Sequence, residues 1–183
     1  IILSKIDKLE NIGFKTKEIS LLDPKYSIAV YTIVQRAEVS SNLARYDGIR
    51  YGSDRGRFGQ EAKRRVMLGT HVLSSGYYDE YYAKGQKVRT LIRENLDQAF
   101  EQVDAIVPPT SPTTALKIGE SEKSPMFGEM QDVLVEASSL AGLPGISVNA
   151  GFSNKLPVGI QFFAPQFEEK LILQIADFVK EDD

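Results

Sequence analysis

The chain has 183 residues, of which 42% are hydrophobic and 26% charged, and its formal net charge is −3. This length suits one globular domain or the larger part of one, and the mild acidity argues against a stand-alone nucleic-acid-binding protein, which is normally basic. The 183 residues include no cysteine and one histidine, His71, which excludes disulfides, thiolate nucleophiles and any site here that needs two histidines.

The first third of the chain is predicted to be mainly helical. Apolar residues spaced by three or four predict a helix over 2–12, which Gly13 ends. The alternation that follows predicts a short strand over 14–20. A proline then favours the first turn of a second helix, expected over 24–44. The Gly- and Arg-rich stretch 47–60 predicts a loop.

Two further helices and a strand are expected in the middle of the chain. Residues 60–74 predict one helix, which Gly76 ends, and 77–103 predict a long one with the clearest helical periodicity in the sequence. The apolar run 104–109 predicts a buried strand whose two prolines stop its pairing.

The last third combines helices with strands. A helix is expected over 127–140, two strands over 146–152 and 158–163, and a final helix over 167–180. Mixed helices and apolar strands of this kind predict the α/β class.

The sequence contains no recognisable catalytic group. It has neither the Gly-x-Ser-x-Gly elbow of many hydrolases nor a phosphate-binding glycine loop. His71 is the one imidazole available to activate a serine, but it stands within a predicted helix beside apolar residues, which favours a structural role. Composition and spacing alone therefore indicate an α/β domain of unassigned activity.

Three residues have both a structural and a functional interpretation. Arg65, in a Lys-Arg-Arg run, belongs to a solvated helix face or clamps a carboxylate through its two-pronged guanidinium. Asp132 complements a helix dipole or receives an ammonium group. Tyr31 lies in the core or lines a ligand pocket. The residue types alone leave these alternatives open.

A family resemblance is carried by long segments that occur in the expected order. These segments are 37–52, 58–70, 73–79, 86–92, 107–112 and 138–148. With them the chain resembles the A subunits of the aspartyl/glutamyl-tRNA(Asn/Gln) amidotransferases, within the amidase signature family. The resemblance covers essentially the whole chain, and it is confined to the C-terminal half of the family's domain.

The resemblance implies a fold and a division of catalytic labour. The fold would be the C-terminal portion of the amidase-signature domain, a mixed sheet flanked by helices, with 1–183 forming a single partial domain. The loop 52–59 is shorter than in the family, so it is expected to be flexible or incomplete. The family's Ser–cis-Ser–Lys triad belongs to the N-terminal half, so no catalytic residue is expected in this chain and the fragment should be inactive alone.

The resemblance also implies substrate and partners. Arg65 would pair with the α-carboxylate of glutamine, Asp132 would hold its α-ammonium group, and Tyr31 would line the same pocket. No metal or cofactor is expected on this chain, since ATP and Mg serve the complex at the partner B subunit. The expected partners are the B and C subunits of a cytoplasmic heterotrimer, with Glu-tRNA(Gln) or Asp-tRNA(Asn) bound mainly through the B subunit and no membrane involved. Two alternatives are another amidase-signature amidohydrolase and a non-catalytic partner-binding module.

Overall fold

The computed structural model describes residues 1–120 and 130–179. The chain divides into two compact units, one formed by residues 1–28 and 91–183 and the other by residues 29–90. We call them the sheet unit and the helical unit. Two helices, α2 (Pro24–Ala44) and α4 (Lys84–Phe100), contribute residues to both. The two units are described separately below.

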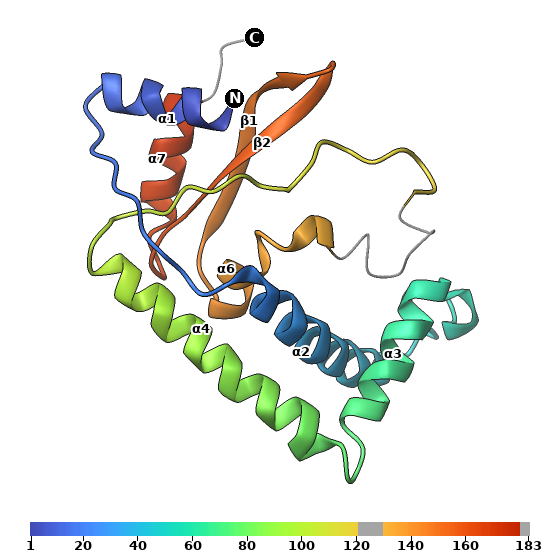
Figure 1. Cartoon of the computed structure of the whole chain (residues 1–183). Coiled ribbons are helices and arrows are strands. Elements are labelled where there is room, and N and C mark those ends of the chain that lie inside the picture. The colour runs from blue at the N-terminus through green and yellow to red at the C-terminus, as the bar shows by residue number, and fades with distance from the viewer. Residues whose placement is uncertain (121–129, 180–183) are drawn as a thin grey trace. The chain divides into compact units, whose positions relative to one another are not determined.

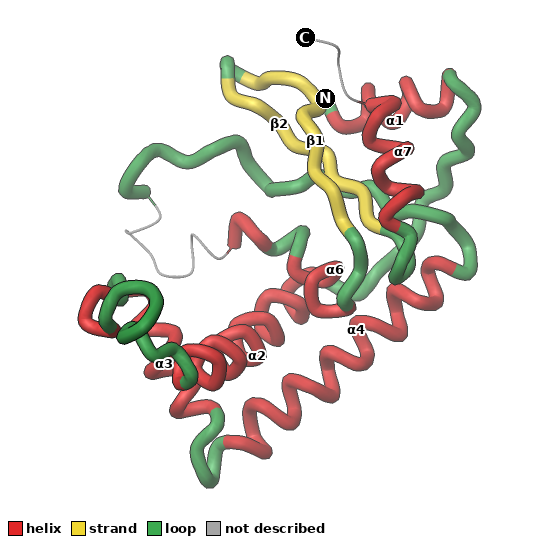
Figure 2. The backbone as a smooth tube through the Cα atoms, turned by 180° about the vertical axis from the view of Figure 1, so that it is seen from behind, coloured by secondary structure: helices red, strands yellow, loops and turns green. Residues whose placement is uncertain are grey.

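The centre of the sheet unit is an antiparallel hairpin of β1 (Gly145–Ser153) and β2 (Leu156–Phe163), drawn in yellow in Figure 2. Its turn residues Asn154 and Lys155 have φ values of 51° and 67°, the left-handed conformation that two-residue hairpin turns require. Both predicted strands are confirmed. They run closer to the turn than predicted, so the connection is shorter than the expected one.

The strand predicted over 104–109 is reduced to isolated bridges beside β2. The Ile106 amide donates to the Phe163 carbonyl at 2.9 Å, and the Phe163 amide returns a bond to Ile106 at 3.1 Å. A second bridge joins Pro109 to Ile160. Prolines lack the N–H that a ladder needs, so the pairing cannot extend into a full strand.

The strand predicted over 14–20 is wrong. Residues 12–23 contain no strand, because no neighbouring strand pairs with this segment within the described part of the chain. Alternation of side chains selects an extended backbone, but a strand also needs a partner for its backbone groups. Several of these residues line an apolar cavity instead.

The core of the sheet unit lies between the hairpin and two helices. Figure 1 shows α1 (Ile2–Asn11) and α7 (Glu169–Val179) beside β1 and β2, and both helices have the predicted amphipathic pattern. The buried cluster consists of Leu9, Ala150, Ile160, Phe162, Ala164, Ile172, Ile175 and Val179. Alternate residues of β2 and one face of each helix thus meet in a single core.

The helix predicted over 127–140 is only partly present. Residues 127–129 lie outside the described residues. The rest forms a 3-10 turn, η4 (Met130–Asp132), followed by the short helix α6 (Glu136–Ala141). Gly142 ends α6 with φ 70°, the left-handed residue that commonly terminates a helix.

The helical unit contains α2 from residue 29, α3 (Gln60–Val72) and the start of α4. A π-helical turn (Tyr78–Ala83) leads directly into α4. The helices predicted in this region are confirmed, although α4 ends at Phe100 rather than 103. The loop predicted over 47–60 is also confirmed, with a single 3-10 turn at Arg55–Arg57.

Helices α2 and α3 touch through their backbones at Gly69. A Cβ added there would overlap the carbonyl oxygen of Arg36 and lie 2.7 Å from the Cβ of Ser40. One residue further on, the hydroxyls of Thr70 and Ser40 share a hydrogen bond of 2.9 Å. The absence of a side chain at Gly69 is therefore what allows the two helices to approach this closely.

We expect Gly69→Ala to lower the free energy of unfolding by about 1–2 kcal/mol. Overpacking costs about 1–3 kcal/mol, and the helix propensity of alanine returns at most about 1 kcal/mol. Gly85→Ala is the matched control, because its added Cβ would meet Ile33 at an ordinary 3.4 Å. Urea unfolding of the two variants tests this, and equal stabilities would contradict it.

Candidate functional site

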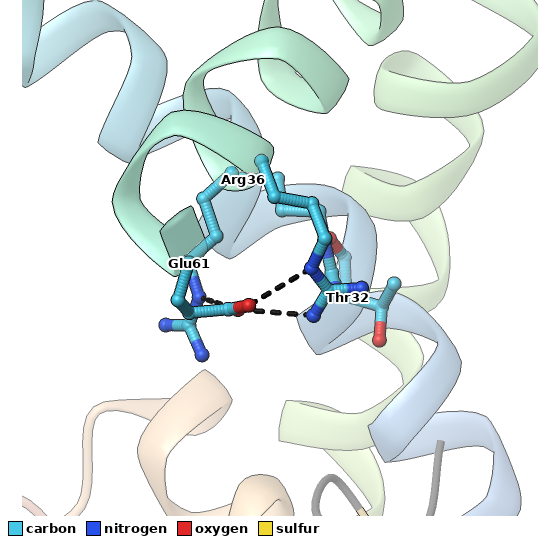
Figure 3. Close-up of polar contacts among 5 residues, drawn as sticks. Thr32, Arg36 and Glu61 are labelled. Carbon is cyan, nitrogen blue, oxygen red and sulfur yellow. Dashed lines mark hydrogen bonds and ion pairs between the residues drawn. The ribbon is translucent and has the colours of Figure 1, made fainter. Parts of the chain in front are cut away.

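Arg65 lies in the second turn of α3, where the first turn places a carboxylate beneath it. Gln60 begins the helix and Glu61 is the acidic residue of its first turn. Residues four apart on a helix lie on the same face, and the Arg65 Nε donates to Glu61 Oε1 at 2.7 Å. Arg64 meets the same carboxylate with two bonds, from Nε at 2.8 Å and from Nη2 at 3.0 Å. Figure 3 shows Glu61 at the centre of these contacts.

The two arginines set the charge of this group. Hydrogen bonds from Arg64 first, and then from Arg65, lower the pKa of Glu61 to about 2. The hydrogen bond to Glu61 in turn raises the pKa of Arg65 above its ordinary value. One carboxylate between two guanidinium groups leaves a net single positive charge at neutral pH.

Tyr31 of α2 reaches the same arginine. A hydrogen bond joins the Tyr31 phenol to the Arg65 guanidinium and contributes to the raised pKa of Arg65. Tyr31 is half-buried, and the Arg65 side chain is 32% exposed. The structure therefore brings together two of the three site residues predicted from the sequence, and it leaves the arginine accessible to a ligand.

Two residues of this site were missed by the sequence analysis. Glu61 could have been identified from the sequence, because a Glu four residues before an Arg is a recognised helical pair. Arg36 stands among apolar residues of α2, and the sequence pattern did not single it out. It is 5% exposed, and its Nη1 donates to the carbonyl of Thr32, one turn earlier, at 2.9 Å (Figure 3).

Asp132 belongs to the sheet unit, so its approach to Arg65 stays a prediction. It is exposed at the end of η4, and its carbonyl accepts a hydrogen bond from Val135 at 2.9 Å. The side chain of its neighbour Gln131 accepts hydrogen bonds from the polar segment that follows residues 104–109. The Gln131 Oε1 accepts from Ser111 at 3.1 Å and from Thr113 at 2.9 Å.

Gln161 anchors the chain that follows Asp132. This β2 residue is 5% exposed, and its Nε2 donates to the carbonyls of Pro109 at 3.0 Å and Leu134 at 2.9 Å. One buried amide therefore ties η4's C-terminal side, the proline segment and the hairpin together. A lone glutamine inside an apolar strand was the sequence signal for this role.

His71 lies in the last turn of α3 and is exposed. Its ring is 4.2 Å from that of Tyr77, measured between centroids, and the planes are inclined by 39°. The stacking contact supports the structural interpretation of this histidine.

The sheet unit also contains an apolar cavity of about 970 Å³. Its lining comes from α1, residues 14–22, the C-terminal part of α4, the 102–108 segment, β2 and α7. Asp132 does not line it, although Val133 and Leu134 do. The lining residues belong to the sheet unit, whereas the polar group around Arg65 belongs to the helical unit.

The comparisons with known proteins agree on one family. A family model described as "Amidase" matches residues 2–173. The chain is 44% identical to the A subunit of glutamyl-tRNA(Gln) amidotransferase from Heliobacterium modesticaldum, covering 96% of this chain and 39% of that protein. It is 48% identical to the protein of the same name from Carboxydothermus hydrogenoformans, covering 93% and 38%. The chain therefore spans about two-fifths of the length of the curated relatives it matches.

Solved structures place the fold in the same group. The chain matches the glutamyl-tRNA(Gln) amidotransferase A subunit of Thermotoga maritima with a TM-score of 0.77 and 39% identity, covering 100% of this chain and 38% of that one. It matches 6-aminohexanoate cyclic dimer hydrolase with a TM-score of 0.75 and 17% identity, covering 97% and 39%, which supports the fold alone. Over the residues described, none of the helices has the length and apolar character that a membrane span needs. The chain belongs to the amidase family.

Proposed function

We propose that this chain is the C-terminal part of the glutamine-hydrolysing A subunit of a tRNA-dependent amidotransferase. The observation that carries the proposal is the contrast in identity, 39% to the Thermotoga maritima A subunit against 15–19% to the other amidases of the same fold. A shared fold alone does not imply a shared function. The higher identity to the A subunit therefore favours the function of the A subunit over those of the other amidases.

The site around Arg65 supports glutamine as the substrate. Free glutamine is a zwitterion, and a guanidinium fork reads its carboxylate with two parallel bonds. Arg65 takes this part, with Tyr31 beside it, and Asp132 takes the ammonium group. Recognition of both charged ends leaves the side-chain amide to the catalytic groups, which positions it for attack.

Catalysis and the later steps are assigned outside this chain. In the family that the sequence resembles, a Ser–cis-Ser–Lys triad hydrolyses the amide, and it stands in the N-terminal half. The ammonia released then reaches a B subunit, where ATP and Mg activate the glutamate or aspartate carried by its tRNA. A C subunit completes the complex, and we place the complex in the cytoplasm.

The apolar cavity of the sheet unit favours the same proposal. The lining of this cavity is mainly apolar, and the curated relatives are about two and a half times as long as this chain. We assign the cavity to the remainder of the A subunit. The assignment also covers the alternative of a partner-binding module. A chain without the triad takes part in glutamine hydrolysis only when it is joined to the part that contains the triad.

The proposal can be tested by placing this chain in a known A subunit. In what we call the hybrid subunit, this chain replaces the matching 38% of the Carboxydothermus hydrogenoformans A subunit. With that organism's partner subunits present, we expect the hybrid to release ammonia from glutamine, and we expect the 183-residue chain alone to release none. The intact Carboxydothermus subunit, prepared in the same way, is the control.

Two outcomes would contradict the proposal. Ammonia release by the 183-residue chain alone would mean that it holds its own catalytic groups. A hybrid that hydrolyses propionamide faster than glutamine would support the alternative of another amidohydrolase, since propionamide lacks both charged groups that Arg65 and Asp132 would bind.

A further inference from the structure

The group around Glu61 contains more contacts than binding a carboxylate needs. A single arginine can clamp a carboxylate, yet here a second arginine and an internal carboxylate stand beside it. The Glu61 side chain is 52% exposed, and those of Arg64 and Arg65 are 38% and 32% exposed. Ion pairs this exposed contribute little to folding stability. The arrangement therefore calls for an explanation other than stability.

The two arginines make different numbers of hydrogen bonds to Glu61. Arg64 takes both carboxylate oxygens, at 2.8 and 3.0 Å, whereas Arg65 donates only through Nε, at 2.7 Å. The bidentate partner neutralises the carboxylate. The single bond to Arg65 is directional, and it leaves the positive charge of Arg65 available to a ligand.

Fixing Nε determines how Arg65 can meet its ligand. An arginine offers a carboxylate either its Nε edge or its two terminal nitrogens. With Nε bonded to Glu61, the N–H groups of the two terminal nitrogens serve both the Tyr31 phenol and a ligand. We propose that Glu61 is a positioning residue that holds Arg65 end-on toward the α-carboxylate of glutamine, while Arg64 cancels the charge of Glu61. This inference rests on the proposed function.

Positioning of Arg65 by Glu61 and repulsion of the substrate by Glu61 predict opposite changes in glutamine binding when Glu61 is removed. A carboxylate next to the binding arginine would also repel the substrate carboxylate, so removal of Glu61 would then tighten glutamine binding. If positioning dominates, removal weakens binding. Arg64 is the reason to expect positioning, because it already holds the anion with two bonds.

The test uses the hybrid subunit with its partner subunits. We expect Glu61→Ala to raise the KM for glutamine roughly 5-fold with kcat nearly unchanged, a size typical of coupled contacts in one network. Glu61→Gln should recover part of this, because its amide oxygen accepts one hydrogen bond. Glutaminamide lacks the carboxylate, so its KM should not change in either variant.

A double variant and a distant control complete the design. If Glu61 acts through Arg65, the double variant Glu61→Ala/Arg65→Ala should be no worse than Arg65→Ala alone. Asp97→Asn is the matched control, because it breaks a comparable exposed pair, Arg93–Asp97, on α4. It should leave the KM for glutamine unchanged.

The outcomes distinguish this inference from the function on which it rests. A lower KM in Glu61→Ala, or additive losses in the double variant, would overturn the positioning role alone. If Arg65→Ala itself leaves glutamine use unchanged, both the assignment of Arg65 and this inference fail. Calorimetric titration with glutamine gives the same comparison through Kd when the catalytic serine of the N-terminal part of the hybrid subunit is replaced by alanine, which stops turnover.

Discussion

Replacement of Arg65 by alanine in the hybrid subunit should lower kcat/KM for glutamine at least about 10-fold. A hydrogen bond to a charged group is worth about 1.5–3 kcal/mol, and each 1.36 kcal/mol is a factor of ten. The substrate carboxylate keeps this contact from binding through reaction, so the loss should fall mainly on KM. Steady-state ammonia release over a range of glutamine concentrations measures it.

Two controls separate recognition from charge. Arg65→Lys keeps the charge but not the planar fork, so it should recover only part of the loss. Arg64→Ala removes the neighbouring arginine, which binds Glu61 rather than the substrate in our proposal, and should have a smaller effect. An Arg65→Ala variant with the glutamine dependence of the parent would disprove the assignment of the α-carboxylate to this residue.

Replacement of Gln161 by leucine should lower the free energy of unfolding by about 2–4 kcal/mol. The change removes the donor that serves the carbonyls of Pro109 and Leu134. The two hydrogen bonds together contribute about 1–3 kcal/mol, and the poorer fit of a leucine at this buried position adds about 1 kcal/mol. At this chain length the midpoint of thermal unfolding should fall by about 5–10 °C. Urea unfolding and calorimetry of the 183-residue chain give both quantities.

A second glutamine offers a matched comparison. Gln166 is exposed and donates one longer bond, 3.3 Å, to the carbonyl of Ala141. Gln166→Leu should therefore cost less than about 1 kcal/mol. Equal losses in the two variants would show that Gln161 is not the special anchor of the segment that follows Asp132.

The sequence predicted elements best where one helix face alone decides the outcome. The α2, α3, α4 and α7 helices follow from apolar spacing, because that periodicity is a property of each helix by itself. The strand over 14–20 failed because a strand exists only with a partner, and alternation cannot supply one. The bridges at Ile106 and Pro109 reflect the same limit, since two prolines interrupt an otherwise suitable strand.

The candidate site was predictable in parts. The Glu61–Arg65 pair is local and could have been read from the sequence, whereas the contact between Tyr31 and Arg65 depends on how α2 and α3 pack. Only the family resemblance selected Tyr31, Arg65 and Asp132 among many residues of their types. Gln161 stands out in the sequence as a lone polar residue in an apolar strand, but its partners and that of Arg36 needed the structure, because they are backbone carbonyls that no sequence pattern identifies.

The close approach at Gly69 has a consequence for ligand binding. Arg65 lies one turn before Gly69 on α3, and Tyr31 lies on α2 shortly before Arg36, whose carbonyl meets Gly69. Backbones in direct contact leave no room for one helix to slide along the other. The guanidinium and the phenol therefore belong to one preorganised body, so a carboxylate that binds there meets a site already formed and loses little further conformational entropy from the protein.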